Sequence, residues 1–94
     1  MSSIVMYYGA ECPHCRAMMP LVDKVISEGN VDIEKKEVWH NQANAQEMRS
    51  HQDVIAPACG GDLGVPGFYS PNTNQALCGE VTYERLREWA VANG

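Results

Sequence analysis

A chain of 94 residues, of which 45% are hydrophobic, is long enough to bury one core and too short for two, so we expect a single domain spanning residues 1–94. The formal charge of −5, with seven Lys and Arg against twelve Asp and Glu, argues against nucleic acid or an anionic membrane as a partner, because both attract clustered positive charge.

No targeting or membrane segment is predicted. The N-terminal apolar run, residues 4–8, is too short for a signal peptide, and no segment approaches the length of a membrane span. We therefore expect a cytoplasmic protein. Because the cytoplasm keeps thiols reduced, four cysteines there favour catalysis or metal binding over a framework of structural disulfides. No long apolar stripe is left over for a subunit interface, so a monomer is expected.

The first half of the chain predicts two strands around a helix. Residues 4–8, IVMYY, form an apolar, β-prone run that predicts a buried strand. A helix is expected over residues 13–26, with a kink at Pro20 and a stop at residues 29–30. The partly alternating stretch 31–39 predicts a second strand, and its charges suit a sheet edge.

The second half predicts a weak helix, a long loop, a hairpin and a final helix. The weak helix covers about residues 44–51, and residues 54–66, rich in Gly and Pro, predict a structured loop. Residues 67–70 and 75–78 are the two strands of the hairpin. Thr82 can cap the final helix, which has one mostly apolar face.

The predicted element order is therefore β-α-β-α-β-β-α. A crossover helix after the first strand implies that the first two strands are parallel, and the hairpin implies an antiparallel pair at the end. The economical architecture is an α/β fold, with a mixed four-stranded sheet packed by three helices.

The motif Cys12-Pro13-His14-Cys15 lies where the first strand leads into the first helix. At the helix N-cap, the sulfur of Cys12 would face unsatisfied backbone N–H groups and the positive end of the helix dipole, which favour the thiolate. Cys15, three residues later on the same face, would be the resolving thiol. We expect Cys12 to attack a substrate disulfide and Cys15 to release the reduced product, with no tightly bound cofactor.

Two charged neighbours act on this thiolate in opposite directions. His14 beside Cys12 would stabilise the thiolate and make it a better leaving group, whereas the carboxylate of Glu11 would disfavour it. The sequence therefore leaves open whether the pair works as a reductant or as an oxidant.

With these features the chain resembles the thioredoxin superfamily, and by its small size it is most similar to the glutaredoxins, over nearly its whole length. The resemblance rests on the CPHC motif after the first strand, on Pro20 in the first helix, and on Val65-Pro66 just before the third strand. It implies the thioredoxin-like fold and a cis Val65–Pro66 bond against the two cysteines. It also implies that the backbone of Val65 pairs with the substrate.

The resemblance further implies glutathione as a co-substrate, bound by Val65 and by the segment Gly79, Glu80, Val81 and Thr82. The chain departs from the usual glutaredoxin pattern here, since Glu80 would repel the carboxylates of glutathione. The expected partners are disulfide-containing proteins or low-molecular-weight thiols, with a reductase or thiol donor to restore the dithiol.

Alternatives to the redox pair stay open. All four cysteines, Cys12, Cys15, Cys59 and Cys78, could form one metal site, or Cys12 could ligate an iron–sulfur cluster shared by two protomers. The uneven cysteine spacing disfavours the first, and Pro13 inside the motif disfavours the second, so the leading prediction contains no metal. A non-catalytic binding scaffold would instead leave Cys12 unreactive.

The remaining cysteines, aromatic residues and histidines are predicted to be structural. Cys59 and Cys78 read as small hydrophobic residues, with a second disulfide or a glutathionylated Cys59 as the alternative. Trp39 and Trp89 are expected to be packing aromatics rather than a ligand platform, and His40 and His51 to lie on the surface.

Overall fold

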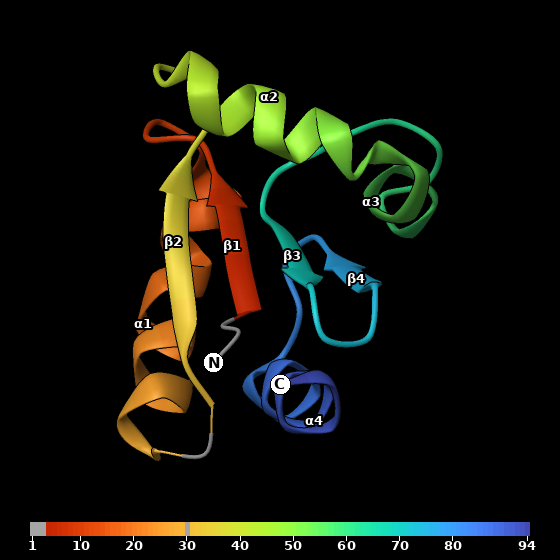
Figure 1. The fold of residues 1–94 in the computed structure, drawn as a ribbon. Helices are drawn as coiled ribbons and strands as arrows, with labels where there is room; N and C mark the ends of the chain where they lie inside the picture. Colours follow the sequence, from red (N-terminus) through yellow and green to blue (C-terminus); the bar gives the residue numbers. More distant parts are fainter. Residues whose placement is uncertain (1–3, 30) are drawn as a thin grey trace.

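Four strands and four helices make up the described part of the chain, residues 4–29 and 31–94 of a computed structural model (Figure 1). Asn30, the second half of the predicted helix stop, lies outside the described residues. The elements are, in chain order, β1 (Ile4–Tyr8), α1 (Pro13–Ser27), β2 (Ile33–Glu37), α2 (Gln42–Ser50), α3 (Gln52–Ala58), β3 (Gly67–Ser70), β4 (Gln75–Cys78) and α4 (Tyr83–Asn93).

The four strands form one mixed sheet in the order β2-β1-β3-β4. β1 and β2 are parallel, with Ile4 opposite Ile33, and α1 provides the crossover between them. β3 is antiparallel to both β1 and β4. The predicted mixed four-stranded sheet is therefore confirmed, and so is the edge position of β2.

Helices cover both faces of the sheet, because successive side chains of β1 point to opposite sides. Ile4 and Met6 pack against α1 and α4, whereas Val5 and Tyr7 pack against α2 and α3. In Figure 1 α2 and α3 lie above and to the right of the strands, and α1 and α4 to the left and below. None of the helices in the described ranges is long and apolar enough to cross a membrane.

The prediction of three helices is wrong, because α3 begins at Gln52 and continues into the segment predicted to be a loop, residues 54–66. Ile55 is fully buried in this helix, in a cluster with Met48 of α2. Pro57 removes only one hydrogen bond near the end of the short helix, and Gly60 and Gly61 take positive φ angles just after it. Burial of Ile55 therefore outweighs the weak helix propensity of the segment.

Two element boundaries also differ from the prediction. β2 spans Ile33–Glu37 rather than residues 31–39, because the Glu37 carboxylate accepts hydrogen bonds from the backbone N–H groups of Trp39 and His40 and turns the chain. α2 begins at Gln42, where the side chain of Asn41 caps it.

Candidate functional site

The two cysteines of the CPHC motif lie at the start of α1, where β1 ends. Cys12 is the N-cap residue with an extended backbone, and Pro13 occupies the first turn, where its missing N–H needs no partner. The N–H of Cys15 donates to the sulfur of Cys12 at 3.4 Å. Both cysteines are free thiols and both are buried, Cys12 with 4% of its surface exposed and Cys15 with none. The predicted helix-capping position of Cys12 is thus present in the structure.

Cys15 differs from Cys12 in its depth below the surface. Burial, reinforced by the hydrogen bond with Cys12, raises the pKa of the Cys15 thiol above its ordinary value of 9.0. The proton of the reduced pair therefore stays on Cys15, because a buried thiolate lacks solvation. Cys12 is the sulfur that a reagent would reach first.

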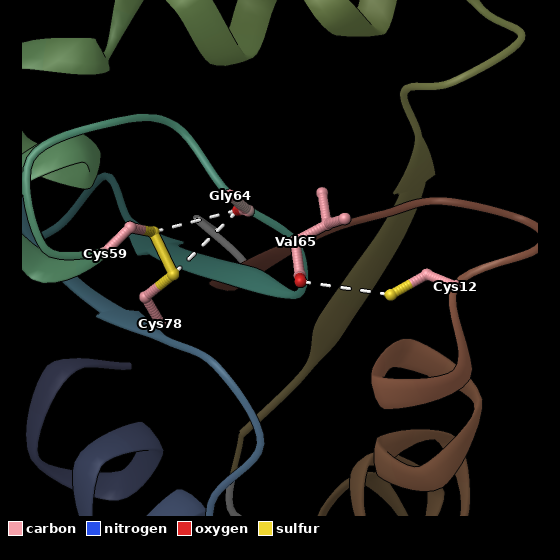
Figure 2. The surroundings of a disulfide bond; sticks show 5 residues. All are labelled: Cys12, Cys59, Gly64, Val65 and Cys78. Atoms are coloured by element: carbon pink, nitrogen blue, oxygen red, sulfur yellow. Dashed lines mark hydrogen bonds between the residues drawn. A yellow bond between two sulfur atoms is a disulfide. The ribbon is translucent and has the colours of Figure 1, made fainter.

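A cis peptide bond faces the dithiol, as the family resemblance implies. The Val65–Pro66 bond is cis, and the carbonyl oxygen of Val65 lies 3.9 Å from the sulfur of Cys12 (Figure 2). Pro66 is fully buried, and its own carbonyl accepts a hydrogen bond of 2.8 Å from the N–H of Gly79. We call Gly64, Val65 and Pro66 the shelf, because this backbone lies directly beside Cys12.

Each predicted charged neighbour of Cys12 has an ion-pair partner. Nδ1 of His14 lies 2.9 Å from a carboxylate oxygen of Glu80, which brings the segment before α4 to the start of α1. Nε2 of His40 lies 2.7 and 2.9 Å from the two carboxylate oxygens of Glu11. His14 was predicted to stabilise the Cys12 thiolate and Glu11 to destabilise it. Each of these effects is weakened, because Glu80 partners His14 and His40 partners Glu11. Sequence reasoning did not find either pairing.

A third carboxylate, that of Glu37, fixes the turn that carries Cys12. Glu37 accepts hydrogen bonds from the backbone N–H groups of Ala10, Trp39 and His40, at 3.0, 3.0 and 2.8 Å. Although burial alone would raise the pKa of Glu37, these backbone bonds lower it. The Trp39 ring covers Gly9 so closely that any Cβ there would overlap it. Trp39 thus packs its ring on Gly9, although 51% of the residue stays exposed.

A small, mostly apolar groove adjoins the shelf. It has a volume of about 200 Å³ and runs from Trp39 and Val38 to Val65. Met48 and Leu63 lie between them, and Arg49 is the charged residue in its lining. The groove can take an apolar group of a molecule whose sulfur lies against Cys12.

Residues 79–82, predicted to bind glutathione, lie close to the site but are already engaged in local structure. Gly79, with a φ of +90°, bonds to the shelf, and Glu80 pairs with His14. Val81 packs against the core, and the hydroxyl of Thr82 caps α4 by accepting from the N–H of Arg85. Backbone groups of this segment, rather than the Thr82 hydroxyl, are therefore what a ligand would find.

Cys59 and Cys78 are joined in a disulfide (Figure 2), so their prediction as small hydrophobic residues is wrong and the alternative of a second disulfide holds. The bond leaves neither sulfur as a free thiolate for a metal site built from all four cysteines. Among residues 4–29 and 31–94, no group of three or more His, Cys, Asp or Glu side chains is placed to hold a metal ion.

The fold and the site together define a small α/β domain, in which a dithiol at a helix N-terminus lies beside a cis-proline at one end of a mixed four-stranded sheet. Searches of protein-family models and of curated protein sequences give no match to this chain.

Proposed function

We propose that the protein is a thiol–disulfide oxidoreductase of thioredoxin-like, glutaredoxin-type fold that acts in the cytoplasm. One observation carries this proposal: the sulfur of Cys12 lies between the N-terminus of α1 and the carbonyl of Val65, with the thiol of Cys15 behind it. A helix N-terminus favours the thiolate, and the backbone of Val65, whose carbonyl accepts from the Cys12 thiol before a substrate arrives, can hold an extended substrate in place.

The reaction transfers two electrons from the dithiol to the substrate. The Cys12 thiolate attacks one sulfur of the substrate disulfide, and the second substrate sulfur leaves as a thiolate that takes up a proton. Cys15 then loses its proton and attacks the sulfur of Cys12, which releases the first substrate sulfur. The products are the reduced substrate and a Cys12–Cys15 disulfide. A thiol donor or a reductase then reduces the Cys12–Cys15 disulfide back to two thiols.

The raised pKa of Cys15 orders these two steps. Because Cys15 holds its proton until a mixed disulfide has formed, it does not compete with Cys12 for the incoming substrate. The thiolate that leaves in the first step is a suitable acceptor for the Cys15 proton in the second. The same two steps run in reverse when the oxidised protein meets a reduced dithiol.

The substrate class follows from what surrounds Cys12. Disulfide-containing proteins can place an extended segment on Val65 and an apolar side chain in the groove beside Trp39. Mixed disulfides with low-molecular-weight thiols such as glutathione are small enough to use the shelf alone. Nδ1 of His14 lies 2.9 Å from the Glu80 carboxylate, so one oxygen of that carboxylate is already engaged and does not face a glutathione carboxylate.

Replacement of each thiol in turn tests the proposal. In a mass-spectrometric exchange assay, Cys12→Ser abolishes reaction with peptide disulfides and with glutathione mixed disulfides. The matched variant Cys15→Ser retains the reaction with glutathione mixed disulfides and accumulates a Cys12 adduct. Full activity of Cys12→Ser would rule out the mechanism. Metal that is bound stoichiometrically, and whose removal by a chelator is needed before Cys12 can be alkylated, would instead favour a metal or iron–sulfur carrier.

A further inference from the structure

The disulfide between Cys59 and Cys78 closes the part of the chain that contains the shelf. Cys59 is the C-cap residue of α3, and Cys78 is the last residue of β4. Their Cα atoms are 5.1 Å apart although the residues are separated by 19 positions. The chain between them includes the loop after α3, the cis bond and the whole of the β3–β4 hairpin.

Both sulfurs of this disulfide lie against the shelf. The carbonyl oxygen of Gly64 is 3.7 Å from the sulfur of Cys59 and 3.9 Å from that of Cys78. The next residue, Val65, presents its own carbonyl to Cys12, so consecutive carbonyls face the two cysteine sites (Figure 2). Beyond them, the N–H of Gly79 holds the carbonyl of Pro66. The disulfide thus contacts Gly64, and Gly79, the residue after Cys78, contacts Pro66. These two contacts lie on either side of Val65.

Reduction would change this contact. Two thiols cannot remain at bonding distance, so the sulfurs of Cys59 and Cys78 must separate, and each gains an S–H donor for which the Gly64 carbonyl is the nearest acceptor. Both residues are half-buried, so a small thiol can reach them from solvent. A shift of Gly64 is passed to Val65 through a planar peptide bond.

We propose that Cys59 and Cys78 form a second redox couple, whose state sets the position of the Val65 carbonyl and thereby the rate at which Cys12 exchanges with extended substrates. This inference rests on the proposed function. The reductant is a thiol of the class already proposed for Cys12 and Cys15. One thiolate attacks a sulfur of the pair, the S–S bond breaks and the other sulfur leaves and takes up a proton. A second thiol then resolves the mixed disulfide, so two thiols are oxidised as two cysteines are reduced.

The test uses the Cys15→Ser protein, in which Cys12 is a single thiol. The protein is equilibrated in mixtures of reduced and oxidised dithiothreitol of graded redox poise, which leave no lasting adduct on Cys12, and the thiols of Cys59 and Cys78 are mapped by alkylation and mass spectrometry. The adduct formed on Cys12 with a peptide mixed disulfide is then timed in the oxidised and the reduced state. Alkylation of Cys12 by iodoacetamide, which needs no shelf, is timed in parallel.

We expect Cys59 and Cys78 to be reduced within the folded protein, and the peptide exchange at Cys12 to slow by about tenfold, the effect of one lost hydrogen bond. The iodoacetamide rate stays unchanged. The added substitutions Cys59→Ser and Cys78→Ser should reproduce the slow rate and make it insensitive to dithiothreitol. If these substitutions prevent folding, the reduced Cys15→Ser protein alone decides the comparison.

Two results overturn the inference alone: a disulfide that is reduced only when urea unfolds the protein, or equal peptide exchange at Cys12 in both states. A different result overturns the proposed function as well. If Cys12 reacts with iodoacetamide but exchanges with the peptide disulfide in neither state, the site does not carry out thiol–disulfide exchange.

Discussion

Gly67 provides a direct test of how tightly the shelf is held. It is the first residue of β3, directly after the cis-proline, and it is fully surrounded. A Cβ at this position would lie 3.1 Å from the carbonyl oxygen of Gly64 and 3.1 Å from the terminal methyl of Met48. The methyl can move aside, but the carbonyl is backbone and can yield only if the shelf moves.

We expect Gly67→Ala to destabilise the protein by about 1–3 kcal/mol, the usual cost of overpacking a filled core. For a domain of this size, each kcal/mol lowers the melting temperature by about 4–8 °C. Exchange of Cys12 with a peptide disulfide should slow, since Val65 moves with Gly64, while alkylation of Cys12 by iodoacetamide stays constant. Urea titration and the two rate measurements check these expectations.

Gly64→Ala is the matched control, three residues away. A Cβ there would meet only atoms at 3.8 and 3.9 Å, which is ordinary van der Waals contact. The control should therefore be as stable as the parent, or slightly more so because Ala restricts the unfolded chain. If Gly67→Ala matched Gly64→Ala in both stability and peptide exchange, the shelf would not be constrained as we argue.

Three further predictions concern the surroundings of the site. His40→Ala exposes Cys12 to the unpaired charge of Glu11 and should slow its alkylation at neutral pH by about twofold to fivefold, with Glu11→Gln restoring the rate. Hydrogen bonding to Glu11 raises the pKa of His40. The parent should therefore stay faster in alkylation than His40→Ala until the pH exceeds that raised pKa. Between pH 9.0 and 10.0, the free energy of unfolding of the protein with Cys12 and Cys15 reduced should fall by at most about 1.4 kcal/mol, because the unfolded chain releases the Cys15 proton and the folded chain keeps it. Above pH 10.0 the buried Tyr7, whose pKa is also raised, adds to the fall, so Cys15→Ser should remove the slope only below that pH in urea titrations. Ile55→Ala should cost about 2–5 kcal/mol in the same titrations, whereas a small loss would mean that α3 is not a packed helix.

Local patterns were sufficient to predict most of the secondary structure. The apolar run of β1, the spacing of apolar residues in α1 and the turn between β3 and β4 are properties of adjacent residues, and the structure has each element there. Thr82 and Cys12 were identified as helix caps for the same reason, since a cap bonds to the residue three positions later. The kink expected at Pro20 stays a prediction.

The errors and omissions involve residues far apart in the sequence. α3 is stabilised by burial of Ile55 against another helix, and a local count of Gly and Pro contains no information about that contact. The pairing of His14 with Glu80 spans 66 positions, and that of Glu11 with His40 spans 29. Ion pairs at such separations follow from the arrangement of the elements, which composition and periodicity do not specify.

Glu37 was missed for a different reason. An acidic residue at the end of an edge strand has many ordinary explanations, and only the folded turns show that three backbone N–H groups converge on this one. The single advance signal was Gly9, a residue without a side chain next to the turn that carries Cys12, which leaves room for the ring of Trp39.

The separation of Cys12 from the Val65 carbonyl, 53 positions along the chain, has a consequence for synthesis of the protein. A growing chain presents both thiols of the CPHC motif long before the residues that face them have been made, and β3 must insert beside β1 before the two can meet. Until then the cysteines lie at the start of α1 without the Val65 carbonyl beside them. Under the proposed function, selective exchange would therefore begin only when the domain is complete, and loss of peptide exchange would be a sensitive sign of incomplete folding.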